Sequence, residues 1–358
     1  TQDLADTVAK KGLFYPPDPS SIKQSTLGGN AACNAGGPRC LKYGVTSDYV
    51  MGLTVVLADG QILKTGGKAI KNVTGYNLTQ LFVGSEGTLG VITELTLKLI
   101  PMPKVARTAK AVFPKLVDAS RCVNEILSTG ITPATIELMD ETAIATIEEA
   151  MHLDLPLDVE AMLIIEADGM EEDSVIREIE AVAEICHATG ARDVEVARDE
   201  EERAALWSAR RAISPSLARR APNKLGEDIS VPRSAIPDAV AAIKEISRKH
   251  DIPIAIFGHA GDGNLHPNIL FDKRDPVQVE KMKKAAADIF DVAVRLEGTL
   301  SGEHGVGNLK LKFLEKDVGP LSIGVMSSIK EALDPKNILN PGKVIPGKST
   351  AGAQLFAW

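Results

Sequence analysis

The sequence predicts an α+β fold, and three features of the chain carry this prediction. From about residue 105 onward, extended apolar runs alternate with segments whose apolar residues recur at helical spacing, a pattern typical of an antiparallel sheet covered by helices. Before residue 100 the chain is rich in Gly, Asn, Thr and Pro and holds only short strands. Pro101 and Pro103 lie between the two regions, and because proline interrupts a strand they predict a domain boundary there.

The composition is that of a globular protein without a membrane span. The 358 residues suffice for two or three domains, and 44% hydrophobic and 25% charged residues are ordinary proportions. The net charge of −8 argues against a nucleic-acid-binding surface. No apolar stretch approaches the roughly 20 residues of a membrane helix, and residues 1–11 lack a signal-peptide pattern. The four cysteines form no CxxC motif, so we expect free thiols in a cytoplasmic, reducing compartment and no iron–sulfur centre.

The first hundred residues are expected to form a short helix, a dense loop and a few strands. Residues 1–11 are helix-like, residues 12–44 form the loop, and residues 50–57 form a strand that the turn at 58–61 returns into 62–64. Residues 91–100 alternate as a further strand. Because the chain enters the loop almost at once, we expect an N-terminal part of this domain to precede residue 1 in the complete protein.

The remaining elements are expected to follow one another with short connections. Strands are predicted over 106–113, 134–139, 161–168 and 191–197, and helices over 115–129, 141–151, 172–189, 199–219, 237–250, 276–296 and 321–333. Asp334-Pro335 ends the last helix, because the residue before a proline disfavours the helical conformation.

Two histidines flank one glycine-rich turn in the segment 258–266, which joins two extended apolar runs. Asp262-Gly263 is a strong hairpin signal. With these as the two turn residues, His259 would lie opposite His266, with Cβ atoms about 5 Å apart on one face of the sheet. Such a pair suits two imidazoles that bind one metal ion at about 2.1 Å each. Asp262 is then either a hydrogen-bonding partner of these ligands or only a turn residue.

A second cluster, Ser301–Gly307, adds a carboxylate and a third imidazole between glycines. His259, His266 and Glu303 together make a three-ligand set that leaves positions open for a substrate. Adjacent side chains diverge in an extended chain, so Glu303 and His304 are not expected to bind the same ion. His304 is then available as a general base, for which the ordinary histidine pKa is suitable. Each histidine taken alone also fits an ordinary hydrogen-bonded residue.

Two glycine-rich segments and an arginine pair complete the candidates. Residues 25–37 and 84–90 carry mostly small side chains, which let backbone N–H groups approach a phosphate or a planar ring. The first segment contains no GxGxxG fingerprint, and composition alone fits a tight structural loop equally well. Arg210 is suited to grip a substrate carboxylate with two parallel hydrogen bonds, although Arg210 and Arg211 also fit a solvated helix face.

Six motifs, in this order, resemble one family. They are Gly28-Gly29-Asn30 through Gly36-Gly37, Thr74-Gly75-Tyr76-Asn77-Leu78, Gly84 to Gly90, Gly258 to His266, Ser301 to Gly307 and Asn340-Pro341-Gly342-Lys343. They resemble the flavin-linked oxidoreductases of the vanillyl-alcohol oxidase type. The most similar branch is that of the FAD-linked D-2-hydroxyacid dehydrogenases and oxidases, which includes D-lactate dehydrogenase and the flavin-linked subunit of glycolate oxidase. The motifs are moderate signals singly, but their joint order over nearly the whole chain is specific.

The resemblance implies a domain order. Residues 1–103 would be the second half of a vanillyl-alcohol-oxidase-type FAD-binding domain, and residues 104–320 an antiparallel-sheet, ferredoxin-like cap domain that binds substrate and carries the metal site. Residues 321–358 would be a C-terminal helical segment that returns to the FAD domain. Members of the family carry, upstream of this region, a glycine-rich loop around the FAD diphosphate that this chain lacks, so we expect the chain alone to bind flavin weakly or not at all.

The resemblance also implies the roles of individual residues. The FAD would be lined by Pro16, Ser25, Gly28, Gly29, Asn34, Gly36, Gly37 and Gly44, with Gly87 and Ile92 helping to hold it. A divalent zinc or manganese ion would be bound by His259, His266 and Glu303. The substrate would be bound by Arg210, Ser214, Lys224 and Asn268, and His304 would be the catalytic base.

The implied activity is the flavin-dependent oxidation of a D-2-hydroxy acid, of the D-lactate or glycolate class, to the 2-oxo acid. His304 would take the hydroxyl proton while the C2 hydride moves to flavin N5. The implied partners are the small 2-hydroxy acid, an electron-transfer flavoprotein or iron–sulfur subunit, and a second copy in a homodimer. The electron acceptor stays open between a quinone, a cytochrome and an electron-transfer flavoprotein. Two other functions stay open: a non-catalytic or truncated subunit of a flavoprotein electron-transfer complex, and a metal-dependent hydrolase that uses only the histidine site.

Overall fold

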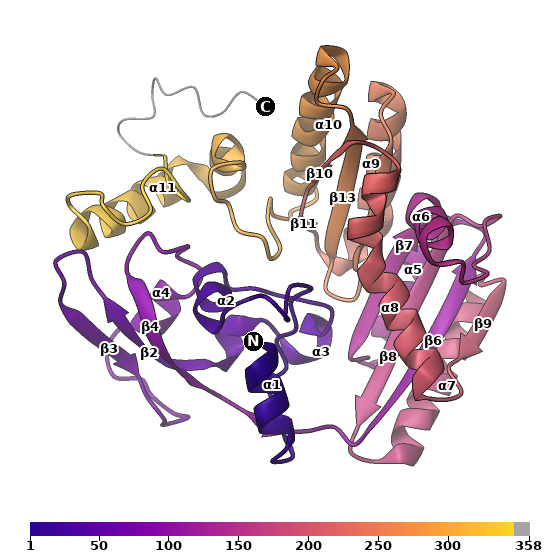
Figure 1. The fold of residues 1–358 in the computed structure, drawn as a ribbon, viewed down its shortest axis with the longest axis horizontal. Coiled ribbons are helices and arrows are strands. Elements are labelled where there is room, and N and C mark those ends of the chain that lie inside the picture. The colour runs from indigo at the N-terminus through magenta and orange to yellow at the C-terminus, as the bar shows by residue number, and fades with distance from the viewer. Residues whose placement is uncertain (347–358) are drawn as a thin grey trace. The chain divides into compact units, whose positions relative to one another are not determined.

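The computed structural model describes residues 1–346, which form two compact units (Figure 1). The first unit holds residues 1–39, 43–102 and 303–346, and the second unit holds residues 40–42 and 103–302. Residues 347–358 of the predicted C-terminal segment lie outside the described residues.

The first unit is built on a small antiparallel sheet in which β2 pairs with β3 on one side and β4 on the other. Val50, Leu53 and Val55 of β2 are buried against Phe82 and Leu89, which gives this unit an apolar core of its own. Its elements are α1 (Gln2–Ala9), β1 (Leu13–Phe14), α2 (Leu27–Cys33), η1 (Thr46–Tyr49), β2 (Val50–Val56), β3 (Ile62–Gly66), α4 (Leu78–Phe82), β4 (Val91–Leu97), β5 (Ile100–Pro101), η4 (Leu311–Phe313) and α11 (Leu314–Leu333). The short helix α3 (Cys40–Tyr43) contains residues of both units.

The glycine-rich segment that was expected to be a loop contains the short helix α2. Glycine disfavours helix, but Thr26 caps the first turn by accepting a hydrogen bond from Gly29 N. Asn34 ends the helix in the left-handed conformation, with φ of 51°. Burial of Asn30 and Ala31 then stabilises the helix more than its composition suggests.

The long C-terminal helix α11 kinks at Gly319, which is followed by Pro320. Its second half corresponds to the helix predicted over 321–333. Ile329 and Leu333 pack against the core of the first unit. The helix ends at the buried Asp334, whose carboxylate accepts hydrogen bonds from Ile338 N at 3.0 Å and Leu339 N at 2.8 Å and from Lys330 Nζ at 2.5 Å.

The second unit is an eight-stranded antiparallel sheet with the order β10-β13-β12-β7-β8-β6-β9, in which β11 also pairs with β13. Strands β7, β12 and β13 are buried along their whole length, so the sheet is covered on both faces. Its strands are β6 (Val105–Phe113), β7 (Thr135–Asp140), β8 (Ala161–Gly169), β9 (Asp193–Val196), β10 (Asn223–Gly226), β11 (Ile229–Ser230), β12 (Ile254–His259) and β13 (Asn264–Phe271).

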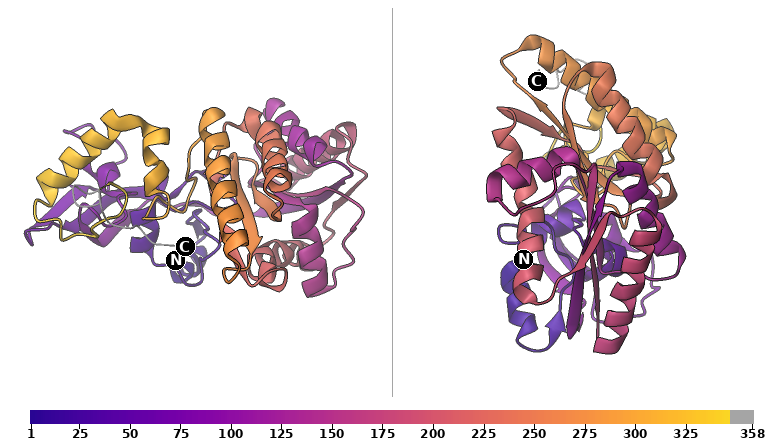
Figure 2. Two further views of the ribbon diagram at one scale, coloured as in Figure 1. Left: turned by 90° about the horizontal axis from the view of Figure 1, so that it is seen from above. Right: turned by 90° about the vertical axis from the view of Figure 1, so that its right-hand side faces the viewer.

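Two helix layers cover this sheet, as Figure 2 shows. One layer consists of α5 (Leu116–Ser128), α7 (Glu172–Ala188), α9 (Ile236–His250) and α10 (Pro276–Arg295). The other consists of α6 (Glu141–Met151) and α8 (Glu200–Ser216). The short helices η2 (Leu217–Arg219) and η3 (Arg233–Ala235) join these elements. Among residues 1–346, no helix combines the length and the apolar character that crossing a bilayer requires.

The predicted order of strands and helices in the second unit is confirmed from residue 105 to residue 296, with bounds that differ by a few residues. The sequence did not predict β10 and β11. Both strands are short, and Glu227 breaks the apolar alternation of Leu225, Ile229 and Val231. Their pairing with β13 is set by the neighbouring strand rather than by their own composition.

Replacing Asp334 by Asn is expected to lower the free energy of unfolding at pH 7 by about 1–3 kcal/mol, because a buried set of hydrogen bonds loses its charged acceptor. Burial raises the pKa of Asp334, but Lys330 and the two backbone N–H groups outweigh it, so the net pKa is lowered. The carboxylate's contribution is therefore complete above the ordinary aspartate pKa of about 3.9 and is lost as the pH falls through the lower folded-state value. Urea unfolding of both proteins between pH 7 and pH 3 measures this, and a difference that stays constant with pH would contradict it.

Candidate active site

The two histidines of the glycine-rich turn lie on neighbouring strands of the second unit, but in a different register from the predicted one. His259 is opposite Asn264, and His266 is opposite Phe257. The prediction of a two-residue turn was therefore wrong, because residues 260–263 form a wider loop. Two backbone hydrogen bonds, from Gly261 N to Ile136 O and from Val231 N to Gly263 O, pair the loop with other segments and not with the opposite strand of the hairpin.

The altered register still leaves both imidazoles on one face of the sheet, as predicted. His266 lies two positions beyond Asn264, the cross-strand partner of His259. A residue and the one two positions beyond its partner are diagonal neighbours on the same face of a sheet. The rings of His259 and His266 have centroids 5.1 Å apart and are nearly perpendicular, at 86°. Both side chains are buried. The hairpin therefore brings the two predicted imidazole ligands together.

A buried glutamate on the adjacent strand β7 fixes His259. Glu137 is fully buried and directly opposite His259, whose Nδ1 lies 2.5 Å from Glu137 Oε1. The other oxygen, Oε2, accepts a hydrogen bond from Arg210 Nε at 2.5 Å. Burial alone would raise the pKa of Glu137, but Arg210 and His259 outweigh it and lower the pKa to about 2. The glutamate is thus ionised near neutral pH and shared between two predicted site residues.

Arg210 reaches this glutamate from α8, on the side of the sheet that α6 and α8 cover. The side chain is almost completely buried, and its guanidinium lies over the Phe257 ring at 5.0 Å. The solvated-face alternative for Arg210 is therefore wrong, whereas its neighbour Arg211 is exposed. The ion pair uses Nε of Arg210, so it does not use the two terminal nitrogens that form a fork around a carboxylate.

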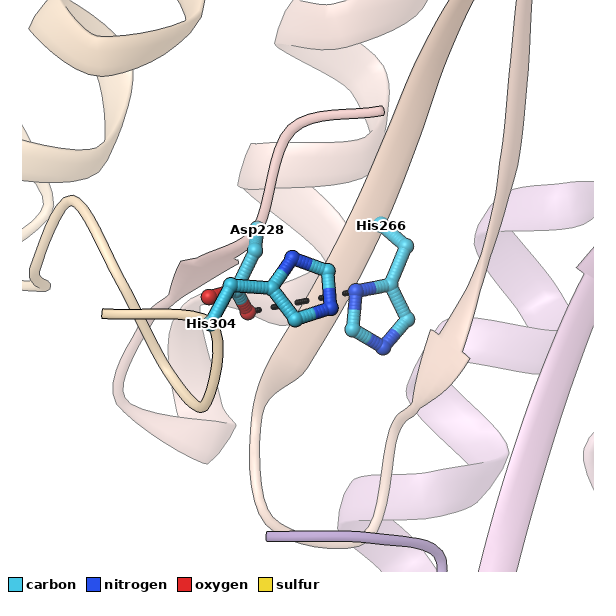
Figure 3. A group of neighbouring side chains, drawn as sticks. All are labelled: Asp228, His266 and His304. Atoms are coloured by element: carbon cyan, nitrogen blue, oxygen red, sulfur yellow. Dashed lines mark ion pairs between the residues drawn. The ribbon is translucent and has the colours of Figure 1, made fainter. Parts of the chain in front are cut away.

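His266 lies beside a second buried carboxylate that the sequence did not single out. Figure 3 shows Asp228 and His266 with the ion pair between Oδ1 and Nδ1, which are 3.9 Å apart. Asp228 also accepts hydrogen bonds from Asn264 Nδ2 at 2.7 Å and Ser301 Oγ at 2.8 Å. The Ser301 hydrogen bond holds the segment ending in Gly302 beside Asp228. Gly302 lies so close to Asn264 that an added Cβ would clash with Asn264 Nδ2.

Three further predicted substrate residues lie on the second unit. Lys224 on β10 donates a hydrogen bond to the carbonyl oxygen of Ser214 at 2.7 Å and lies 2.5 Å from its Oγ, so the structure brings these two together. Asn268 is buried on β13 and donates to the carbonyl of His266 at 2.9 Å. Asp262, by contrast, accepts a hydrogen bond from Asn264 N, as a turn residue does.

Glu303 and His304 follow Gly302 in the chain and belong to the first unit. Their side chains were expected to diverge, but His304 Nε2 lies 3.6 Å from Glu303 Oε1. The expectation assumed an extended chain, whereas the backbone bends here and reaches a φ of 81° at Gly305. Glu303 is mostly buried, and His304 has 53% of its side chain exposed.

The residues after His304 are held by Glu86, from the second glycine-rich motif of the same unit. The Glu86 carboxylate accepts hydrogen bonds from Val306 N at 2.7 Å and Gly307 N at 2.9 Å. A Cβ at Gly305 would lie 2.5 Å from Glu86 Oε1, which explains the glycine. Asn340 Nδ2 donates to the Glu86 carbonyl at 2.6 Å. One residue therefore joins three of the motifs that the sequence showed to be distant from one another.

The predicted FAD-lining residues all lie in the first unit, and the space around four of their glycines separates these four into two kinds. Gly37 and Gly44 are required by the protein itself, because a Cβ would lie 2.5 Å from Asp18 O or 2.2 Å from Asp48 Oδ2. Gly28 and Gly87 instead leave the space beside the backbone open, with nothing nearer than 3.9 Å to a Cβ at Gly28 and nothing within 4 Å at Gly87. The remaining six are Pro16, Ser25, Gly29, Asn34, Gly36 and Ile92, of which Pro16 and Gly36 are buried.

Three buried or clamping acids were missed from the sequence: Glu137, Asp228 and Glu86. Glu137 had a usable signal, because it is a charged residue inside the apolar run 134–139, where only a paired carboxylate is tolerated. Asp228 and Glu86 had none, since acids in polar loop segments are common.

Two family models match the chain. One, described as FAD linked oxidases, C-terminal domain, matches residues 102–344, and another, described as FAD binding domain, matches residues 1–66.

Curated relatives match over almost the whole chain. Glycolate oxidase subunit GlcD of Bacillus subtilis is 49% identical over 344 residues, which cover 96% of this chain and 73% of that protein. D-lactate dehydrogenase of Anaerostipes hadrus is 37% identical over 352 residues, which cover 96% of this chain and 73% of that protein. A solved structure of alkyldihydroxyacetonephosphate synthase shares the fold with a TM-score of 0.68 at 20% identity, over 95% of this chain and 62% of that one.

Replacing Glu86 by Gln is expected to raise the amide hydrogen-exchange rates of Val306 and Gly307 by about tenfold or more. A hydrogen bond to a charged acceptor contributes roughly 1.5–3 kcal/mol, and the amide recovers only part of it. Hydrogen exchange followed by mass spectrometry of peptides spanning 303–310 measures the change. Glu94→Gln, on β4 of the same unit, is the matched control and should leave these peptides unaffected. Equal exchange in all three proteins would show that Glu86 does not hold this loop.

Proposed function

The chain belongs to the family of FAD-linked oxidases, which its sequence predicted, and on this premise we propose that it oxidises a D-2-hydroxy acid of the D-lactate or glycolate class to the 2-oxo acid. The relatives named for glycolate and D-lactate support this substrate class. The observation that carries the proposal is the buried group of Arg210, Glu137 and His259, in which a guanidinium suited to bind a carboxylate and an imidazole share one acid.

FAD is the cofactor of this family, and the match to an FAD binding domain covers residues 1–66, of which all but 40–42 belong to the first unit. When bound, it accepts the hydride from C2 of the substrate. We propose that Gly28 and Gly87 approach it most closely, because their open backbone gives a phosphate or a flat ring direct access to N–H groups. Gly37 and Gly44 would contribute by shaping the loop around it.

We propose that His259, His266 and Glu303 hold a zinc or manganese ion, as the sequence predicted. The donor set suits either metal, and metal-binding histidines usually donate their other ring N–H to a carboxylate. Nδ1 of His259 lies within hydrogen-bond distance of such a carboxylate, that of Glu137. Glu303 is one residue from Gly302, which packs against Asn264 on the histidine hairpin. When bound, the ion polarises the hydroxyl and carboxylate of the substrate.

The substrate carboxylate would be gripped by the two terminal nitrogens of Arg210. A fork of parallel N–H groups matches a carboxylate in geometry as well as charge. Lys224 and Ser214, already joined to each other, would assist, and Asn268 would face the substrate beside His266.

His304 would remove the hydroxyl proton of the substrate as the hydride leaves C2. Its partly exposed ring can pass the proton on to water, and the Glu303 carboxylate at 3.6 Å stabilises the charged imidazolium. Proton and hydride together account for the two hydrogens lost when a hydroxy acid becomes an oxo acid.

The electron acceptor and assembly follow from the same proposal. The Bacillus relative is named as a subunit, which supports an electron-accepting partner subunit, either an electron-transfer flavoprotein or an iron–sulfur protein. We propose a homodimer and a cytoplasmic location as well, the latter because none of the four cysteines, all within the described residues, forms a disulfide. The histidine and glutamate set is complete here, which disfavours a non-catalytic subunit, and a hydrolase would leave the glycine motifs without a role.

Replacing His304 by Ala is expected to lower turnover of D-lactate or glycolate by about 10²–10⁴-fold, because the reaction loses its general base. The measurement is bleaching of the flavin absorption under anaerobic conditions after addition of the hydroxy acid. His187→Ala, an exposed histidine on α7, is the matched control and should bleach at the wild-type rate. A wild-type flavin that neither acid bleaches would rule out the proposed substrate class.

Removal of divalent metal by a chelator is expected to abolish turnover while the flavin stays bound, since the ion acts on the substrate and not on the cofactor. Addition of zinc or manganese should restore activity, and elemental analysis should find one ion per chain. Full turnover in protein shown to be metal-free would contradict a catalytic ion.

A further inference from the structure

We propose that Glu137 is a positioning residue that orients the substrate-binding arginine and a metal-binding histidine through the two oxygens of one carboxylate. This inference rests on the proposed function for what Arg210 and His259 bind. Beyond the proposed function, the orientation of both Arg210 and His259 is assigned to Glu137, a residue that would contact neither the substrate nor the metal.

The first support is the division of hydrogen bonds within the carboxylate. Oε1 lies 2.5 Å from His259 Nδ1, and Oε2 lies 2.5 Å from Arg210 Nε. Arg210 donates to Oε2, so the carboxylate is placed to accept from Nδ1 of His259 through Oε1, and this arrangement would leave the lone pair of Nε2 for a metal ion. The same carboxylate bonds Nε of Arg210 and leaves the terminal nitrogens to meet a substrate. One side chain therefore sets both the tautomer of the histidine and the direction of the arginine fork.

The second support is the rigidity of the parts. Glu137 is fully buried in a central strand and lies directly opposite His259, so its backbone is fixed by the sheet. Thr135, also buried, donates a further hydrogen bond to Oε1 at 3.3 Å. Phe257 packs under the Arg210 guanidinium. A carboxylate held in this way cannot rotate without losing several bonds at once.

A second arginine–glutamate pair, between the same helix and the sheet, resembles the Arg210–Glu137 pair but has no predicted ligand beside it. Arg203 lies two helical turns before Arg210 on α8 and bonds the buried Glu166 of β8 at 2.9 Å. Glu166 takes its other hydrogen bonds from Thr108 and Trp207, and neither is a predicted ligand. Both glutamates anchor α8 to the sheet, but only Glu137 reaches a predicted metal ligand. Glu166 is therefore the matched control.

The test compares Glu137→Gln with Glu166→Gln in the complete FAD-loaded enzyme and in its metal-free form. Zinc and manganese affinities are measured by competition with a chelating indicator, and kcat and KM are measured for D-lactate and glycolate. Glu137→Gln should bind metal about 10–100-fold more weakly and show a raised KM, because glutamine cannot accept bonds at both atoms. Glu166→Gln should keep the wild-type metal affinity even if both variants lose thermal stability.

A third measurement needs no variant that might fail to fold. Nitrogen-15 NMR of the six histidines in the wild-type protein, with the His259 ring assigned by through-bond correlation to its own backbone amide, reports the ring tautomer. A protonated Nδ1 at His259 supports the inference, and a protonated Nε2 with bare Nδ1 overturns it. Equal metal affinity in Glu137→Gln and Glu166→Gln also overturns it. If the wild-type enzyme neither binds metal nor oxidises either acid, the proposed function fails, and the tautomer still decides whether Glu137 orients His259.

Discussion

A charged carboxylate in the centre of a sheet must be neutralised by its neighbours, and this requirement organises the second unit. Glu137 is completely buried, so its ionised form persists only because Arg210 and His259 contact it on either side. Losing either partner of such a buried pair typically costs about 3–5 kcal/mol. Helix α8, strand β7 and the β12–β13 hairpin are therefore tied to one another at the point where the predicted site residues meet.

The first unit uses a glutamate in a comparable way, although on a loop. The Glu86 carboxylate accepts from two successive backbone amides beyond His304, and its carbonyl accepts from Asn340. Loops are usually the least constrained parts of a protein, yet this one carries the proposed base. The fixed geometry that proton removal needs is then supplied by a residue 220 positions away from Val306 in the chain.

Much of the fold was predictable because its signals are local. The strands 106–113 and 161–168 and the helices around them have the period and length that single elements require, and the structure confirms them. The hairpin register was not predictable in this way. It depends on hydrogen bonds that Gly261 N donates to Ile136 O and that Gly263 O accepts from Val231 N. Both partners are distant in the sequence, and a turn signal such as Asp262-Gly263 carries no information about them.

The site shows the same limit. The candidate ligands His259, His266 and Glu303 could be selected from the sequence, because histidines and acids between glycines are unusual. Their supporting residues could not, because Asp228 and Glu86 look like ordinary loop acids until Ser301 and Val306 are found beside them. The helix at 27–33 was not predicted, because its glycines give it a weak helix propensity. The cap at Thr26 and the burial of Ala31 outweigh that propensity in the folded protein.

The most direct measurement is an anomalous-diffraction map of zinc-loaded crystals of the complete protein, recorded at the zinc absorption edge. A metal ion on the hairpin would give one strong peak about 2.1 Å from a ring nitrogen of His259 and of His266, with a Glu303 oxygen completing the contacts. A map whose only zinc peaks lie elsewhere, with the two imidazoles contacting protein alone, would contradict the claim that this hairpin is a metal-assisted oxidation site.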